Sequence, residues 1–257
     1  MRVTEVALGL WLGGGLTLLP AQGRDDSKAP TEPREKEPEA MRVMVDRILA
    51  RENELSRTLK NYSPRIETYL QSYESNKETG DEPTNDYYFF GRLDFGTMQL
   101  QSFLSQSGSG VFPPSFGGTQ KKAFTFQHEM DGFVQAALVD YRGFSREHYQ
   151  FQYVRSEFLG EVRCFVFELL PAEKAESGQF KGRIWVEDHD YTIVRFKGVR
   201  LDPPRFHVYY HFDSWRQELQ PKLWLPTYIY AEESDLHVRM MLSPKSTVIR
   251  FRSQTRF

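Results

Sequence analysis

Cysteine is almost absent from this chain, which has 257 residues and only Cys164. A single cysteine cannot form an internal disulfide, so no covalent cross-link holds the fold together. Cys164 lies between apolar residues in the stretch EVRCFVFEL, and free cysteines in such surroundings are commonly buried. We interpret it as a packing residue, because nothing beside it in the sequence marks an activated nucleophile.

The chain also lacks an excess of charge of either sign. Its 33 Lys and Arg residues nearly balance 35 Asp and Glu residues, which gives a net charge of -2. Nucleic-acid-binding domains usually carry a clear positive excess. Nucleic acid is therefore not expected as a partner.

Long hydrophobic runs are missing as well. The apolar run over residues 6–19 is shorter than the roughly 20 residues that a membrane-spanning helix needs. Arg2 precedes the run and the small residues Ala21 and Gly23 follow it, which is typical of a secretory signal peptide cleaved near Gly23. We expect an exported protein, periplasmic or secreted, with no integral membrane span in its mature chain.

Local motifs of catalysis and metal binding are absent too. The sequence has no GxxxxGK[ST] phosphate loop, no GxSxG nucleophile elbow and no CxxC pair. His207 and His211 would stand about 13 Å apart on a strand, too far to share one metal ion. A Ser-His-Asp triad assembles from distant residues and is not decided by such a search. We predict no enzymatic activity, no metal site and no cofactor.

Two segments precede the expected β-rich domain. Residues 24–40 combine charges with prolines and carry no large apolar side chain, which predicts a disordered tether. From Met41 onward, apolar residues recur at helical spacing and predict one amphipathic helix. Asn61 and Pro64 end this pattern.

Aromatic residues are abundant, at 14% of the chain, and favour β-strands. Residues 41–257 are expected to form a single domain of consecutive antiparallel strands after the helix. In HYQFQYV, for example, apolar and polar residues alternate, as in a sheet with one wet face. The predicted strands cover residues 65–73, 85–96, 148–159, 161–171, 180–198 as a hairpin, 204–215, 222–233, 236–243 and 246–257.

One insertion interrupts the strands at residues 102–119, which are rich in Ser, Gly and Pro. Its Phe112 and Phe116 are candidates for a mobile lid over an apolar cavity. The alternative is a solvated insert with a few aromatic side chains tucked down.

The acidic stretch EDHD, residues 187–190, lies between the two strands of the predicted hairpin. Asp residues favour turns because they bond their own backbone, so we interpret EDHD as the corner of the hairpin. A calcium site at Asp188 and Asp190 is the alternative, but the Gly and distal Glu of an EF-hand loop are missing. The register of the hairpin stays open.

Three short motifs stand out between residues 153 and 230. They are GRIWV, DYTIVR and WLP, and the residues concerned are Gly182, Ile184, Trp185, Val186, Ile193, Val194, Arg195, Trp224, Leu225 and Pro226. In this region the chain resembles the LolA/LolB-type superfamily of periplasmic lipoprotein carriers, including RseB-like relatives. The resemblance implies a mainly β (α+β) fold in which a strongly curved antiparallel sheet, or half-open barrel, wraps around helices. It also implies that the concave face holds acyl chains.

Several apolar residues are candidates for binding such a ligand. Large aromatic rings and flexible Met side chains suit an adaptable apolar wall, although each also suits a plain core. The candidate ligand-binding residues are Trp185, Trp224, Tyr228, Tyr230, Val238 and Met240.

These observations favour an exported carrier or binding protein for a lipid, a lipoprotein acyl chain or another apolar ligand. A non-catalytic interaction module or envelope sensor with a protein partner is the second interpretation. An outer-membrane β-barrel, suggested by the terminal Phe257, is less favoured because most strands carry charges on both faces or are too short.

Overall fold

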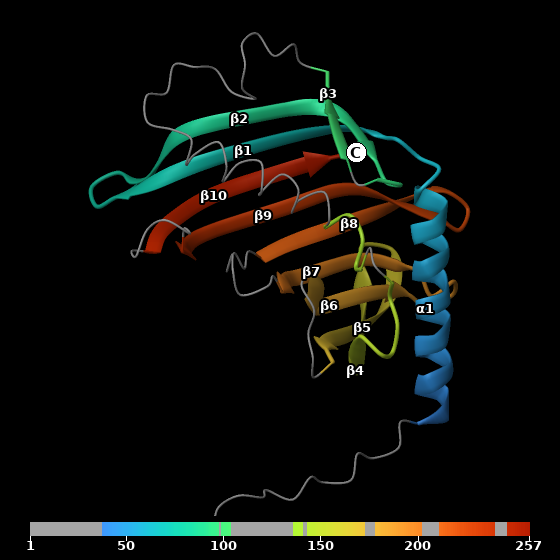
Figure 1. Ribbon diagram of the computed structural model, residues 1–257. Coiled ribbons are helices and arrows are strands. Elements are labelled where there is room, and N and C mark those ends of the chain that lie inside the picture. The colour runs from blue at the N-terminus through green and yellow to red at the C-terminus, as the bar shows by residue number, and fades with distance from the viewer. Residues whose placement is uncertain are drawn as a thin grey trace, which may run out of the picture. The chain divides into compact units, whose positions relative to one another are not determined.

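Figure 1 shows the computed structural model of the chain, in which a long helix stands beside a broad curved sheet. The structure describes residues 38–97, 99–103, 136–140, 143–172, 178–201, 211–239 and 246–257. The expected signal peptide, most of the tether, and the lid candidates Phe112 and Phe116 lie outside the described residues.

Helix α1 spans Glu39–Leu59, close to the predicted bounds. Its buried residues are Val45, Ile48, Glu52, Leu55 and Leu59, whose spacing of three and four residues places them on one stripe. Four members of this stripe are apolar and pack into the main core. Glu52 is the exception, so the sheet must supply a partner for a buried carboxylate.

In the described residues the sheet contains ten strands, and neighbouring strands are antiparallel. They are β1 (Arg65–Asn76), β2 (Gly80–Asp94), β3 (Gln99–Ser102), β4 (Tyr149–Leu159), β5 (Val162–Pro171), β6 (Gln179–Glu187), β7 (Ile193–Leu201), β8 (His211–Gln220), β9 (Leu223–Arg239) and β10 (Ser246–Arg256). Their order is β3-β2-β1-β10-β9-β8-β7-β6-β5-β4. The predicted mainly β fold with an N-terminal helix is confirmed.

The strand order departs from a simple succession at one place. From β4 to β10 each strand pairs with the next, but β1 pairs with β10, so the first hairpin joins the last strand. Two predicted strands are in fact one, since β9 runs through the polar stretch after Tyr230 and pairs with β10 across a register shift. In the described part of the chain, β3 and β4 remain the two edges of an open sheet.

The two faces of the sheet differ, and we name them by their relation to α1. On β8, Phe212, Ser214 and Arg216 are buried and lie on the side of the helix, which we call the inner face. Asp213 and Trp215 alternate with them and lie on the outer face. The inner face carries the main core, which also includes the apolar residues of the α1 stripe and residues 136–139.

A pair of glycines makes room for part of this core. Gly182 on β6 lies directly opposite Gly198 on β7, and a Cβ atom on either residue would overlap backbone atoms of the other strand. The Phe180 ring lies against Gly182 and packs with Phe196 and Phe212, and the three ring centroids lie 5.7 to 5.8 Å apart. Phe196 meets Phe180 and Phe212 edge-on, which is a favourable aromatic geometry, and Phe180 and Phe212 are tilted to each other.

The buried Glu52 meets Arg216 in a two-pronged ion pair. Arg216 Nη1 lies 2.6 Å from Oε2 and Nη2 lies 2.7 Å from Oε1 of Glu52, and both side chains are almost fully buried, at 0% and 2% exposure. Arg216 also donates to the Ile193 carbonyl oxygen, and the Val139 backbone N–H donates to Glu52. One charge pair therefore joins α1, β7, β8 and residues 136–140.

Residues 136–140 are held by two further buried side chains. Arg200 on β7 donates to the carbonyl oxygens of Leu138 and Val139. The Tyr149 hydroxyl donates to Asp140 at 2.8 Å and accepts from the Phe180 backbone N–H. Burial raises the pKa of Tyr149, so this hydroxyl stays protonated and remains a donor.

Removing one charge of the buried pair should be costly. We expect Glu52→Gln to lower the free energy of unfolding by about 3 to 5 kcal/mol, because Arg216 is then buried without a counter-ion. Glu54→Gln is the matched control, since Glu54 pairs with Arg51 on the exposed side of the same helix and should cost about 1 kcal/mol or less. Urea unfolding measures both variants, and a Glu52→Gln protein as stable as the control would contradict this role.

The glycine pair generates a second stability prediction. Gly198→Ala should lower the free energy of unfolding by about 1 to 3 kcal/mol, because the added methyl group has to displace the β6 backbone. In Gly96→Ala, the control, the new methyl group would meet the Asp94 carboxylate and otherwise little. Equal thermal midpoints for the two variants would show that the close approach at Gly198 is not needed.

Candidate functional site

A row of aromatic and arginine side chains crosses the outer face. The strand register places Trp185 of β6 opposite Arg195 of β7, Arg195 opposite Trp215 of β8, and Trp215 opposite Tyr228 of β9. Directly paired residues share a face of an antiparallel sheet. Tyr230 follows Tyr228 on the same face, because Ile229 between them is buried on the inner face.

Arg195 links two of these rings. Its guanidinium carbon lies 4.6 Å from the centre of the Trp185 ring and 4.1 Å from that of Trp215, within the range of cation–π contacts. Asp213 accepts two hydrogen bonds from the same guanidinium, at 2.8 and 2.5 Å. The positive charge of Arg195 is thus neutralised while its plane stays between the indoles.

A second apolar cluster lies beneath one end of this row. It consists of Cys164, Val166, Trp185 and Val194, and Trp224 packs against it. Trp185 is only 6% exposed, and its indole N–H donates to Glu157 of β4. The pKa of the Glu157 carboxyl is lowered, mainly by that hydrogen bond. The outer face therefore has an apolar centre of its own, separated from the main core by the sheet.

We call Trp185, Trp215, Trp224, Tyr228, Tyr230 and Arg195 the aromatic row.

The structure brings together four of the six predicted ligand-binding residues. Trp185, Trp224, Tyr228 and Tyr230 all belong to the aromatic row. They lie on the outer face, whereas the family resemblance led us to expect a ligand on the face that wraps the helix. The reason is alternation along the strands, since the inner positions beside them carry buried core residues. The side chains of Val238 and Met240 lie outside the described residues.

Sequence reasoning missed two members of the row, Arg195 as its centre and Trp215. The sequence motif DYTIVR contains Arg195 but does not show which residue lies opposite it. A register shift between Trp185 and Val186 decides that this residue is Trp185. The open register of the hairpin is thereby settled: Ile184 lies opposite Phe196. The alternation in HFDSW already indicated that Trp215 shares a face with Asp213.

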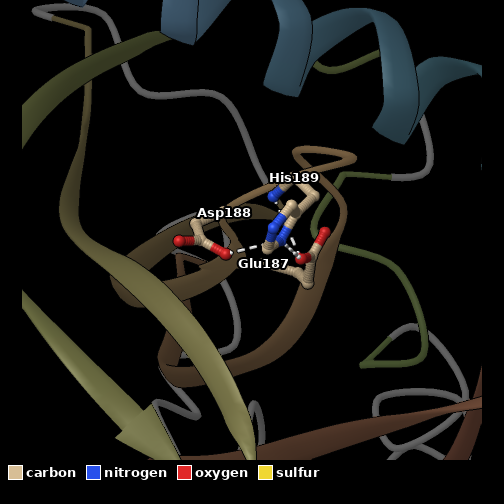
Figure 2. Close-up of side chains that lie close together, drawn as sticks. All are labelled: Glu187, Asp188 and His189. Atoms are coloured by element: carbon tan, nitrogen blue, oxygen red, sulfur yellow. Dashed lines mark hydrogen bonds and ion pairs between the residues drawn. The ribbon is translucent and has the colours of Figure 1, made fainter.

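The EDHD stretch forms the corner between β6 and β7, as predicted. The Glu187 carboxylate accepts the backbone N–H groups of His189, at 3.0 Å, and Asp190, at 2.7 Å, which closes the turn. Tyr191 has a positive φ of 60°, which a residue other than glycine rarely adopts. Figure 2 shows the His189 ring beside the carboxylates of Glu187 and Asp188. The hydrogen bond to Glu187 and the neighbouring charges raise the pKa of His189.

The corner is also where helix α1 docks onto the sheet. Arg51 donates to the Asp190 carbonyl oxygen at 3.1 Å, and its guanidinium lies 3.7 Å from the Asp190 carboxylate. Arg47, one turn earlier, lies 5.0 Å from the centre of the Tyr191 ring. These contacts explain how the surroundings hold Tyr191 in an unfavourable backbone conformation.

Among the described residues, no helix is both long and apolar enough to cross a membrane. No protein family and no curated protein matches the sequence. One crystal structure with similarity is an outer membrane lipoprotein-sorting protein domain from Vibrio parahaemolyticus, at 10% sequence identity and a TM-score of 0.29. The match covers 80% of this chain and 88% of that one.

The interpretation of Cys164 as a packing residue can be tested directly. The thiol is fully buried, and burial raises its pKa to about 12. Since the thiolate is the reactive form, we expect no alkylation by iodoacetamide at pH 8 in the native protein and complete alkylation in urea. Mass spectrometry measures the labelled fraction, and rapid labelling of the native chain would mark Cys164 as accessible.

Proposed function

We propose that this chain is an exported binding protein that holds a lipid, a lipoprotein acyl chain or another apolar ligand against the outer face of its sheet. The aromatic row carries the proposal. Export rests on the character of residues 1–23. Val238 and Met240, and Phe112 and Phe116 as a lid, remain predicted additions to the ligand site.

The position of the rings favours ligand binding over a purely structural role. The main core is complete without the row, since it is built from the inner face, α1 and residues 136–140. Trp215, Trp224, Tyr228 and Tyr230 are only partly buried, so each offers part of a large apolar surface to solvent. Aromatic side chains gathered in this way are typical of sites for apolar ligands.

The charges around the row favour an apolar ligand over an anionic one. Asp213 neutralises Arg195 through two hydrogen bonds. Farther along β9, Glu232 pairs with Arg252 of β10 at 3.0 Å. An anion would have to break such pairs to gain a partner, whereas an acyl chain gains apolar contact without breaking any.

Intrinsic fluorescence gives a selective test, because three of the four tryptophans, Trp185, Trp215 and Trp224, belong to the row. A brominated fatty acid should quench this fluorescence to saturation in the full chain. Tyr228→Glu and Trp224→Glu should weaken that binding at least about tenfold, since a carboxylate has to be desolvated beneath the acyl chain. The measurement is a quenching titration with each variant shown to be folded by circular dichroism.

Tyr88→Glu is the matched control. Tyr88 lies on the outer side of β2, is 51% exposed, and bonds Glu67 outside the aromatic row. The Tyr88→Glu variant should bind the brominated fatty acid like the unaltered chain. Equal weakening in all three variants, or no quenching in any, would contradict the proposal. If the probe binds as expected, native mass spectrometry followed by solvent extraction would identify the natural ligand.

A second candidate function rests on the edge strand β4. Phe158 is 67% exposed there, and Tyr153 and Val154 are also exposed. An edge strand offers unpaired backbone groups to a partner strand, as in interaction modules. The register shift beside Val154 interrupts this edge, so β4 is a weaker candidate than the row. Capture of one protein partner without lipid would favour it.

A further inference from the structure

Three consecutive side chains at the β6–β7 corner each bring one metal-ligating atom to the same point. The donor atoms of Glu187, Asp188 and His189 all lie within 4.8 Å of one another (Figure 2). His189 Nδ1 lies 2.8 Å from Glu187 Oε1 and also 2.8 Å from Asp188 Oδ1. One imidazole nitrogen therefore faces two carboxylate oxygens at once.

The Asp188 carboxylate adds an independent observation. Its Oδ1 atom is screened from solvent and accepts no hydrogen bond of regular geometry, and its ion-pair partner is His189 Nδ1 at 2.8 Å. The side chain is only 10% exposed. The other oxygen, Oδ2, faces Arg163 at 3.4 Å, so the unsatisfied atom is the one aimed into the cluster. A buried carboxylate oxygen without a donor is costly and calls for an explanation.

A cation would resolve this arrangement better than a proton. A proton on Nδ1 forms a hydrogen bond of regular geometry only to Glu187, so Asp188 Oδ1 gains the attraction of the charge without a well-aligned donor. Two metal–ligand bonds of about 2.1 Å at a right angle place their donor atoms about 3 Å apart. The observed 2.8 Å separations are close to that value. Nδ1 is thus already spaced from each carboxylate oxygen as a neighbouring ligand of one ion would be.

The kind of ion follows from the kind of donor. We propose that Glu187, Asp188 and His189 bind a divalent first-row transition-metal ion, such as Zn²⁺ or Mn²⁺, with water in its remaining positions. An imidazole nitrogen together with carboxylate oxygens suits these ions, whereas Ca²⁺ takes oxygen ligands. The site lies beyond what the sequence predicts, which is no metal.

Asp190 does not belong to this site. Its carboxylate oxygen lies 3.5 Å from Lys222 Nζ and 3.7 Å from Arg51 Nη2, so it is turned toward two cations. The calcium site that the sequence offered as an alternative, at Asp188 and Asp190, therefore lacks one of its two ligands. Asp190 instead helps to attach α1, which makes it a useful control.

The test uses the full chain without a histidine tag, stripped with a chelator and titrated with Zn²⁺ or Mn²⁺ alone. We expect one equivalent to bind. His189→Gln and Asp188→Asn should each weaken binding at least about tenfold, since even the loss of a residue that only supports a ligand costs about that much. Isothermal titration calorimetry measures the affinity, and Mn²⁺ should broaden the NMR signals of the His189 ring.

Two control variants separate this site from ordinary histidine chemistry. His211→Gln removes an exposed histidine that also lies 2.8 Å from a carboxylate, that of Glu233. Asp190→Asn alters the corner without removing a proposed ligand. Both should bind the ion like the unaltered chain. Absence of stoichiometric binding, binding that survives in His189→Gln and Asp188→Asn, or equal loss in His211→Gln would each overturn the proposal.

Discussion

The buried ion pair between Glu52 and Arg216 is the interaction on which the rest of this structure depends. A carboxylate in the apolar stripe of α1 is tolerated only where a buried cation meets it in good geometry. Arg216 does so with both of its terminal nitrogens, while Val139 and Ile193 satisfy further hydrogen bonds of the pair. The helix is thereby set in one rotation and one height against β8, since a shifted helix would leave two charges buried without partners.

This constraint divides the sheet into two faces with different roles. Because Arg216 points toward the helix, its neighbour Trp215 points away from it. The strand register pairs Trp215 with Arg195 and Tyr228, and Arg195 with Trp185, so these residues lie on the same outer face. The inner face is occupied by core side chains, α1 and residues 136–140. Trp215, Trp224, Tyr228 and Tyr230 on the outer face are consequently only partly buried, which is the physical basis for proposing ligand binding there.

The corner at residues 187–190 depends on the same attachment of the helix. Arg51 holds Asp190 and Arg47 covers Tyr191, so α1 stabilises a turn whose backbone is unfavourable on its own. With the backbone set in this way, three neighbouring side chains converge instead of spreading into solvent. Helix docking and the convergence of Glu187, Asp188 and His189 are thus two results of one local conformation.

The sequence by itself determined what depends on residues close together in the chain. Helical spacing around Ile48, alternation in HYQFQYV and the acidic corner were all read correctly, because periodicity and turn chemistry are local. The tertiary structure alone decided the pairing of β1 with β10, the partner of Glu52 and the face taken by Trp185 and Tyr228. Each of these depends on contacts between residues far apart in the chain, and local periodicity carries no information about which distant strand or charge will meet them.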